Sequence, residues 1–177
     1  MSIKINYSNK AISKSSANLV LYSDEKFNIS NLKKYTSIAE FTYINDLLKS
    51  SDLKKNMFIF EVNSKKKIIL ISIKKDLRSH DIENLGAEFY ERINNGKNSE
   101  YFINSDSMTG KQENFIGHFL HGLKLKSYKF NKYKTKKETR LITLNVLGNK
   151  NKPSIQNQLK FKALEEGIFY ARDLVSE

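Results

Sequence analysis

The chain has 177 residues, a net charge of +12 and no cysteine. This length suits one domain of ordinary size, and 39% hydrophobic residues are enough to form a core. The missing cysteines exclude a disulfide framework and thiolate metal sites. No apolar run reaches the ~18 residues of a membrane span, and the sequence opens on an alternating pattern rather than a signal peptide. We therefore expect a cytoplasmic protein.

The positive charge raises the question of nucleic-acid binding. Of the 31 basic residues, however, 27 are lysine, and asparagine is also common, at 19 residues. An AT-rich coding sequence would give this bias without selection for binding. Arginine, whose planar guanidinium suits phosphates and base edges better, occurs only four times. We interpret the lysine excess as a solvated surface and keep a polyanion-binding surface as the alternative.

The first half of the chain predicts four strands and one helix. Ile3, Ile5 and Tyr7 alternate with polar residues, which predicts a half-buried strand, and the apolar run at 18–22 predicts a central one. Ser37 and Glu40 form a capping box, followed by a helical stripe of Ile38, Phe41, Ile44, Leu47 and Leu48. Residues 57–62 and 67–73 predict an antiparallel hairpin whose lysines at 65–67 are solvated.

The second half predicts two further helices and two strands. Ser79 is expected to cap a helix that ends at Gly96 and buries Ile82, Leu85, Gly86, Phe89 and Ile93. A strand at 100–104 precedes a helix that starts near Lys111 and buries Phe115, Ile116, Phe119, Leu120 and Leu123. Residues 127–135 predict a ribbon with its aromatic residues Tyr128, Phe130 and Tyr133 toward the core, and 141–146 predict the last strand.

The end of the chain predicts a helix with one apolar stripe, formed by Phe161, Leu164, Ile168, Ala171 and Val175. Pro153 suits a first helical turn, and no Gly, Asn or Pro follows Val175 as a stop signal. We therefore expect the chain to stop at a boundary between two domains, with the stripe facing protein. The carboxylates of Glu165, Glu166 and Asp173 lie off this stripe and are expected on a solvated face.

The alternation of strands and helices, with one hairpin inserted, predicts the α/β class with a mixed sheet covered by helices on both faces. We expect residues 1–150 to form this domain and residues 151–177 to form a helix that leads out of it.

Catalytic patterns are missing from the sequence. His118 and His121 are three residues apart on a predicted helix and could together ligate a metal, but no third ligand is visible near them. They flank Phe119 and Leu120, which belong to the predicted core, so we interpret both as histidines at the rim of the core. No arrangement of a nucleophile with a histidine and an acid is found either.

Two segments resemble the N-terminal part of leucyl (cytosol) aminopeptidases. The first comprises 163–167 and 171–177 and is similar to the interdomain helix of that family, which a Pro, an Asn and the catalytic domain usually follow. The second, with similar order and spacing, consists of Phe115, Gly122, Leu123, Leu125, Tyr128, Phe130 and the run 133–137. Together they cover roughly a quarter of the chain.

This resemblance implies a three-layer α/β/α fold related in shape to macro domains. It also implies that the full-length enzyme removes N-terminal residues from peptides with two divalent ions, zinc or manganese, and assembles as a homo-hexamer. The family's metal ligands and catalytic residues lie in its C-terminal domain, and none of those motifs occurs here, so no catalytic or metal residue is assigned. We expect an architectural domain whose partner is its own catalytic domain, where peptide substrates bind.

The alternative is a DNA-binding module, because some members of that family bind DNA. The candidate surface lies at 124–137, where seven lysines alternate with three aromatic residues. Its candidate polyanion-binding residues are Lys124, Lys126, Lys129, Lys132, Lys134, Lys136 and Lys137. Lysine supplies charge without the planar geometry that reads base edges, so we expect such binding to be weak and salt-dependent.

Overall fold

The computed structural model describes residues 3–11, 18–96, 99–110, 112–130 and 141–176. Its strands are β1 (Ile3–Ser8), β2 (Asn18–Asp24), β3 (Met57–Asn63), β4 (Lys66–Ile73), β5 (Glu100–Asn104) and β6 (Ile142–Leu147). Its α-helices are α1 (Ile38–Lys49), α2 (Ser79–Asn94), α3 (Phe115–Lys126) and α4 (Ile155–Ser176). Two short 3-10 helices, η1 (Ser30–Lys34) and η2 (Ser105–Ser107), complete the described elements.

The six strands form one mixed sheet in the order β1-β6-β5-β2-β4-β3. All neighbours pair in parallel except β3 and β4, which form the predicted antiparallel hairpin. The predicted central strand is β2, which lies between β4 and β5 and is buried along almost its whole length. A strand buried on both faces needs an apolar run rather than alternation, and Leu19–Tyr22 supplies it.

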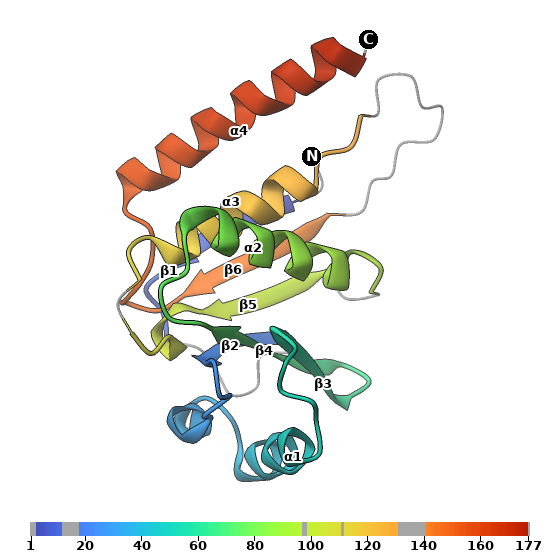
Figure 1. Ribbon diagram of the computed structural model, residues 1–177, viewed down its shortest axis with the longest axis vertical. Helices are drawn as coiled ribbons and strands as arrows, with labels where there is room; N and C mark the ends of the chain where they lie inside the picture. Colours follow the sequence, from blue (N-terminus) through green and yellow to red (C-terminus); the bar gives the residue numbers. More distant parts are fainter. Residues whose placement is uncertain (1–2, 12–17, 97–98, 111, 131–140, 177) are drawn as a thin grey trace.

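Helices cover both faces of the sheet, so the domain has three layers (Figure 1). Successive residues of a strand point to opposite faces. Val20 and Tyr22 therefore belong to the core under α2 and α3, whereas Leu19 and Leu21 belong to the core shared with η1 and α1. Helix α4 lies outside α3 as the outermost element on that side of the sheet. The expected α/β/α class is confirmed.

The start of α1 combines a local signal with a contact from the sheet. The predicted capping box is present: Glu40 N donates to Ser37 Oγ at 3.2 Å, and Ser37 N donates to the Glu40 carboxylate at 2.9 Å. The same carboxylate lies 2.6 Å from Lys66 Nζ at the beginning of β4. Lys66 is only 9% exposed, so the prediction of a solvated lysine turn is wrong at this residue, which neutralises a carboxylate instead.

Several element boundaries differ from the predictions for identifiable reasons. Arg78, not Ser79, is the N-cap of α2, because the Asp81 carboxylate accepts a hydrogen bond from Arg78 N. Helix α3 begins at Phe115 rather than near Lys111, since Asn114 adopts the left-handed conformation with φ of 56° and interrupts a helical backbone. The last strand begins one residue later than predicted, at Ile142.

Two further predictions, the buried face of α1 and the ribbon at 127–135, are also wrong. In α1 only Ile44 and Leu48 of the expected stripe are buried, and Ile38, at the first helical position, is 89% exposed. The predicted ribbon at 127–135 is absent from its described part, because residues 128–130 have no strand structure. The remainder of that ribbon lies outside the described residues.

Among the described residues, no helix combines the length and the apolar composition needed to cross a membrane.

The two helices on the α4 side of the sheet approach each other at backbone distance. A Cβ atom added to Gly86 in α2 would lie 1.9 Å from the carbonyl oxygen of Phe119 in α3. Reciprocally, a Cβ atom on Gly122 in α3 would lie 2.0 Å from the carbonyl oxygen of Glu83 in α2. Only glycine fits at both places, since a backbone atom, unlike the end of a side chain, has no rotamer that moves it aside.

We expect Gly86→Ala or Gly122→Ala to force the two helices apart and to lower the free energy of unfolding by about 2–3 kcal/mol, the upper range of overpacking effects. The matched control is Gly167→Ala in α4, where no atom lies within 4 Å of the added Cβ. That change should stabilise the helix by up to ~1 kcal/mol, the propensity difference between the two residues. Urea unfolding measures all three variants, and equal effects at the three positions would contradict the close contact.

The Glu40–Lys66 ion pair makes a pH-dependent contribution to stability. Burial raises the pKa of Glu40, but hydrogen bonds from Lys66 and Ser37, together with the lysine charge, lower the pKa by more. A depressed folded-state pKa adds stability at neutral pH that is lost as pH falls below the ordinary 4.5 of a glutamate. We expect Lys66→Met to destabilise the protein at pH 7, and to do so progressively less as the pH is lowered and Glu40 takes up a proton.

Unfolding titrations of the unmodified chain and of Lys66→Met, over a series of pH values from 7 downward, measure this difference. As a control, Lys67→Met removes a lysine whose partner, Glu61, is 67% exposed and should change little. A destabilisation by Lys66→Met that is independent of pH would show that lost packing, not charge, is the cause.

Candidate functional site

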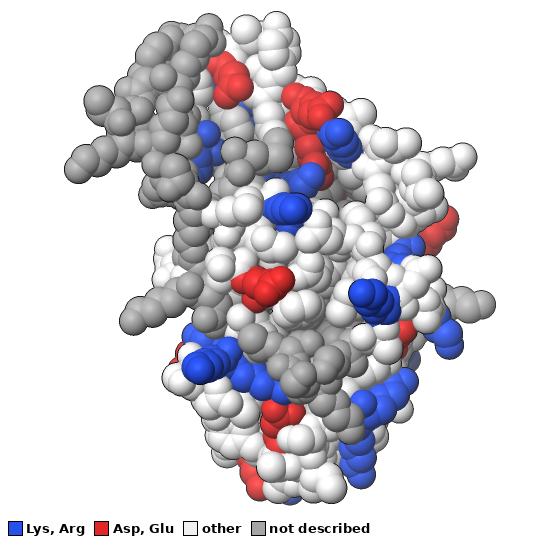
Figure 2. Space-filling view, turned by 180° about the vertical axis from the view of Figure 1, so that it is seen from behind, with Lys and Arg blue, Asp and Glu red and all other residues white. Residues whose placement is uncertain are grey.

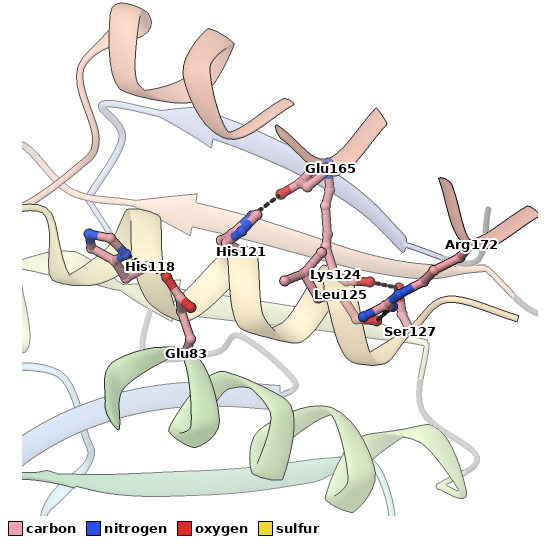
Figure 3. A network of polar contacts seen from close by, with 8 residues as sticks. All are labelled: Glu83, His118, His121, Lys124, Leu125, Ser127, Glu165 and Arg172. Carbon is pink, nitrogen blue, oxygen red and sulfur yellow. Dashed lines mark hydrogen bonds and ion pairs between the residues drawn. The ribbon is translucent and has the colours of Figure 1, made fainter. Parts of the chain in front are cut away.

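The candidate site is the contact between α3 and α4, where a network of polar side chains joins the long terminal helix to the domain (Figure 3). Only Phe161 and Glu165 of α4 are buried. These residues are four apart and therefore lie on the same side of the helix, above α3.

Glu165 is the centre of this network. Its carboxylate accepts hydrogen bonds from His121 Nδ1 at 3.2 Å and from Lys124 Nζ at 2.8 Å. The side chains of His121 and Glu165 are only 6% and 5% exposed, and that of Lys124 is 19% exposed. A carboxylate without water is costly unless it is paired, and here two donors from successive positions of one face of α3 replace water. Because a carboxylate only accepts, the contact also places a proton on His121 Nδ1.

The negative charge of Glu165 also acts on Tyr7 of strand β1. Tyr7 of β1 lines a cavity of about 240 Å³ together with His121, Lys124, Phe161 and Glu165. Burial, and next the negative charge of Glu165, raise the pKa of Tyr7 to about 12. The phenol therefore stays protonated at neutral pH.

Phe161 is the apolar part of the same contact. Its ring lies 5.0 Å, between centroids, from the rings of both His118 and His121. A Cβ atom on Gly117 of α3 would come within 2.6 Å of the Phe161 ring, so the missing side chain at Gly117 makes room for it. His118 in turn donates from Nδ1 to Glu83 of α2 at 2.9 Å, which connects the contact to the next helix.

A second attachment lies beyond the C-terminal end of α3. The ring of Tyr128 stacks on Phe169 at 5.4 Å, and its hydroxyl donates to Asp173 at 2.7 Å. Arg172 lies over the Tyr128 ring and donates from Nη1 to the carbonyl oxygen of Leu125 at 2.8 Å. A cation that binds a last-turn carbonyl is favoured there by the helix dipole. Helix α4 is therefore held at two points along its length.

This arrangement corrects several predictions. Glu165, expected on a solvated face, is 4% exposed, and His121, expected at the rim, is 6% exposed. Tyr128 faces α4 instead of the core of the domain. The predicted stripe is not the packed one, since Leu164 is 45% exposed and Val175 is 89% exposed. Glu165 was missed because its partners lie 44 and 41 residues away in sequence.

The seven predicted polyanion-binding lysines are only partly described. Lys124 binds Glu165, Lys126 lies 2.7 Å from Glu91 and Lys129 is exposed. Lys132, Lys134, Lys136 and Lys137 lie outside the described residues. On the face seen in Figure 2, the described Lys and Arg side chains form small groups between acidic and uncharged residues. The DNA hypothesis stays a prediction.

A larger cavity, of about 530 Å³, lies at the carboxyl ends of β2 and β4. Three acids and three lysines line it, namely Asp24, Glu25, Asp76, Lys26, Lys74 and Lys75. These charges balance, so the lining favours neither an anion nor a cation.

The polar groups of the α3–α4 contact are paired with one another and attach α4 to the domain. Each of its acids accepts a hydrogen bond from a neighbouring side chain: Glu83 from a histidine, Glu165 from a histidine and a lysine, and Asp173 from a tyrosine. Within the described part of the chain, no three His, Cys, Asp or Glu side chains gather closely enough to hold a metal ion. The residues present here therefore do not fit a divalent-metal centre.

Comparison with known proteins identifies the fold. No family model matches the sequence, and no curated protein matches it. Among solved structures, the chain is similar to a mutant of tomato leucine aminopeptidase, with a TM-score of 0.71 and 16% sequence identity. The match covers 99% of this chain and 38% of that chain, so this chain spans well under half of the aminopeptidase's length. At this identity the likeness shows a shared fold.

We expect Glu165→Ala to leave Lys124 and His121 facing each other without their acid, and to lower the free energy of unfolding by roughly 2 kcal/mol, less than for a fully buried pair because Lys124 keeps some water. Glu166→Ala, at the adjacent exposed position, should change it by less than ~0.5 kcal/mol. Urea unfolding and amide hydrogen exchange in α4 measure the effect. Similar results for both variants would argue against this attachment of α4.

Proposed function

We propose that this chain is the N-terminal, non-catalytic domain of a leucyl aminopeptidase, a metal-dependent exopeptidase that releases N-terminal amino acids. In this proposal residues 1–150 form the domain and residues 151–177 form the helix that leads to the catalytic domain. The proposal rests on the structural similarity, which covers 99% of this chain but only 38% of the tomato leucine aminopeptidase chain. A domain with such coverage would be one part of a longer enzyme.

The position of the two resembling segments supports the proposal. One segment includes the end of α3 with Tyr128, and the other lies within α4. They meet in space, because Tyr128 stacks on Phe169 and donates to Asp173. The segments that resemble the aminopeptidase family are thus the ones that attach α4 to the domain, as expected of a helix that sets the orientation of a following domain.

The role that we propose for this domain is architectural. The rigid attachment of α4 at Glu165 and Arg172 would hold the catalytic domain in a fixed orientation. Two manganese or zinc ions and the peptide substrate would bind in that second domain, and the whole enzyme would work in the cytoplasm as a homo-hexamer. The DNA-binding alternative gains no support from Lys124 and Lys126, whose charges are balanced by Glu165 and Glu91.

We expect the 177-residue chain to show no turnover of a leucine anilide with excess manganese or zinc, because its described residues offer no metal centre. The protein encoded by the complete reading frame should hydrolyse the same substrate in a metal-dependent manner. Turnover by the chain alone that scales with its concentration and survives repurification would refute the non-catalytic assignment. An inactive complete protein, tested with both metals, would refute the aminopeptidase assignment.

A further inference from the structure

The cavity of about 530 Å³ at the carboxyl ends of β2 and β4 lies where the connections of the sheet change direction. The next parallel strand after β2 is β4, on one side of β2, whereas β5 lies on the other side of β2 and is followed by β6, still further away. From β2 the chain passes to α1 on one face of the sheet, and from β5 it passes to α3 on the opposite face (Figure 1). In open α/β sheets such a switch point leaves a crevice at the carboxyl ends of the strands, where ligands bind.

The wall of this cavity is built by segments that follow three neighbouring strands, namely 24–26 after β2, 73–77 after β4 and 109–110 after β5 and η2. Gln112, which also lines the cavity, holds the second segment in place, because its Nε2 donates to the carbonyl oxygen of Lys74 at 2.9 Å. The Asp24 carboxylate orders the first segment by accepting from the backbone N–H of Lys26 at 3.1 Å and of Asn28 at 2.9 Å. A cavity of this volume has the size of a small-molecule site.

The backbone around the cavity adopts unusual conformations. Positive φ angles occur at Phe27, with 54°, at Asp76, with 56°, and at Gly110, with 109°, so that each of the three segments contains or adjoins one. A bulky residue such as phenylalanine is rarely found in this region of backbone space. Such conformations tend to cluster at binding sites, where the surrounding structure enforces them.

One buried polar atom beside the cavity is also unused. The Oε1 atom of Gln112 is buried and has no hydrogen-bond donor within the described part of the chain, although Nε2 of the same side chain is engaged. Buried acceptors are nearly always paired in folded proteins. An N–H group of a ligand, reached by a small rotation of the amide, would supply the missing donor.

The charged side chains around the cavity do not neutralise one another. Within the described part of the chain, Lys26, Lys74 and Lys75 form no ion pair, and neither do the carboxylates of Glu25 and Asp76. All five residues are exposed. The cavity therefore presents separate positive and negative groups to whatever enters it.

This combination of groups indicates the class of ligand. A molecule with a single charge would meet like charges as well as opposite ones, whereas a molecule with an ammonium and a carboxylate can turn each toward its opposite. Ile73, which is 8% exposed, and Leu77, which packs on the core, give the same wall an apolar part. A free α-amino acid with an apolar side chain carries all three matching features.

We propose that the cavity at the carboxyl ends of β2 and β4 is a binding site for a free α-amino acid with an apolar side chain, whose ammonium faces the acids and whose carboxylate faces the lysines. The proposal concerns the 177-residue chain itself and does not rest on the aminopeptidase assignment, so the two can fail separately.

The first experiment titrates the ¹⁵N-labelled chain with L-valine at constant pH and ionic strength and follows the backbone amide signals. We expect saturable shifts at 24–26, 74–77 and 109–110. Isobutylamine and 3-methylbutanoate share the side chain of valine but carry only the ammonium or only the carboxylate. Each should bind at least about tenfold more weakly, because one charged contact is lost. Inorganic phosphate, a probe for a plain anion site, should also bind more weakly than valine.

The second experiment changes two adjacent residues of opposite charge. Asp76→Asn keeps a residue that tolerates the left-handed conformation and removes one negative charge. It should weaken valine binding several-fold and shift the preference between the two analogues toward 3-methylbutanoate. Lys75→Gln should also weaken valine binding but shift that preference toward isobutylamine. The control Lys65→Gln changes an exposed lysine before the amino end of β4, at the other end of that strand from the cavity, and should alter neither.

Thermal unfolding of the three variants checks that the fold is retained. The proposal would be overturned by a chain that shows no saturable shifts with valine, or shifts scattered over the whole surface. Equal affinity for valine and for either single-charge analogue would overturn the zwitterionic ligand, and tighter binding of phosphate would show an anion site instead. Unchanged valine affinity in both Asp76→Asn and Lys75→Gln would also overturn the proposal, because the ligand would then bind elsewhere.

Discussion

The backbone contact between α2 and α3 is the constraint on which the α4 side of the molecule depends. Gly86 and Gly122 each face a carbonyl oxygen of the other helix, so the helices can neither rotate nor separate without losing the contact. This fixes which side of α3 faces the sheet, where Phe115, Phe119 and Leu123 enter the core. The remaining side is then available to α4 and carries His118, His121 and Lys124. Two glycines without any chemistry of their own thereby determine where the polar network can form.

The attachment of α4 is specific because it is polar. Burial of apolar side chains is non-directional, and α4 has apolar residues on more than one side, so hydrophobic packing alone would allow several rotations of the helix about its axis. A buried carboxylate removes this freedom, since Glu165 is tolerable only where His121 and Lys124 can reach it. Arg172 and Tyr128 repeat the constraint two turns further along.

The sequence predicted those elements in which local pattern and burial coincide. All five predicted residues of α2 are buried, as are the five of α3, because each of these helices has one apolar side and packs on one core. The hairpin, the central strand β2 and the capping box at Ser37 were predicted for similar reasons. The packed side of α4 could not be predicted, because Leu164 and Phe161 are equally apolar and only the fold reveals that Glu165 has two donors above α3. The burial of Lys66 could not be predicted either, because its partner Glu40 lies in α1, which the strand β3 separates from Lys66 in the sequence.

These two ion pairs bear on how the charge of the chain is interpreted. A net charge of +12 describes the sum over the sequence and says nothing about where each cation lies. Lys66 and Lys124 are among the lysines that contribute to this sum, yet each neutralises a carboxylate that is 11% exposed or less. Replacing either lysine would therefore remove a counter-charge from the interior rather than thin out a binding surface. Because an unpaired buried carboxylate costs far more than a lost surface contact, we expect replacement of either lysine to lower stability more than replacement of an exposed lysine.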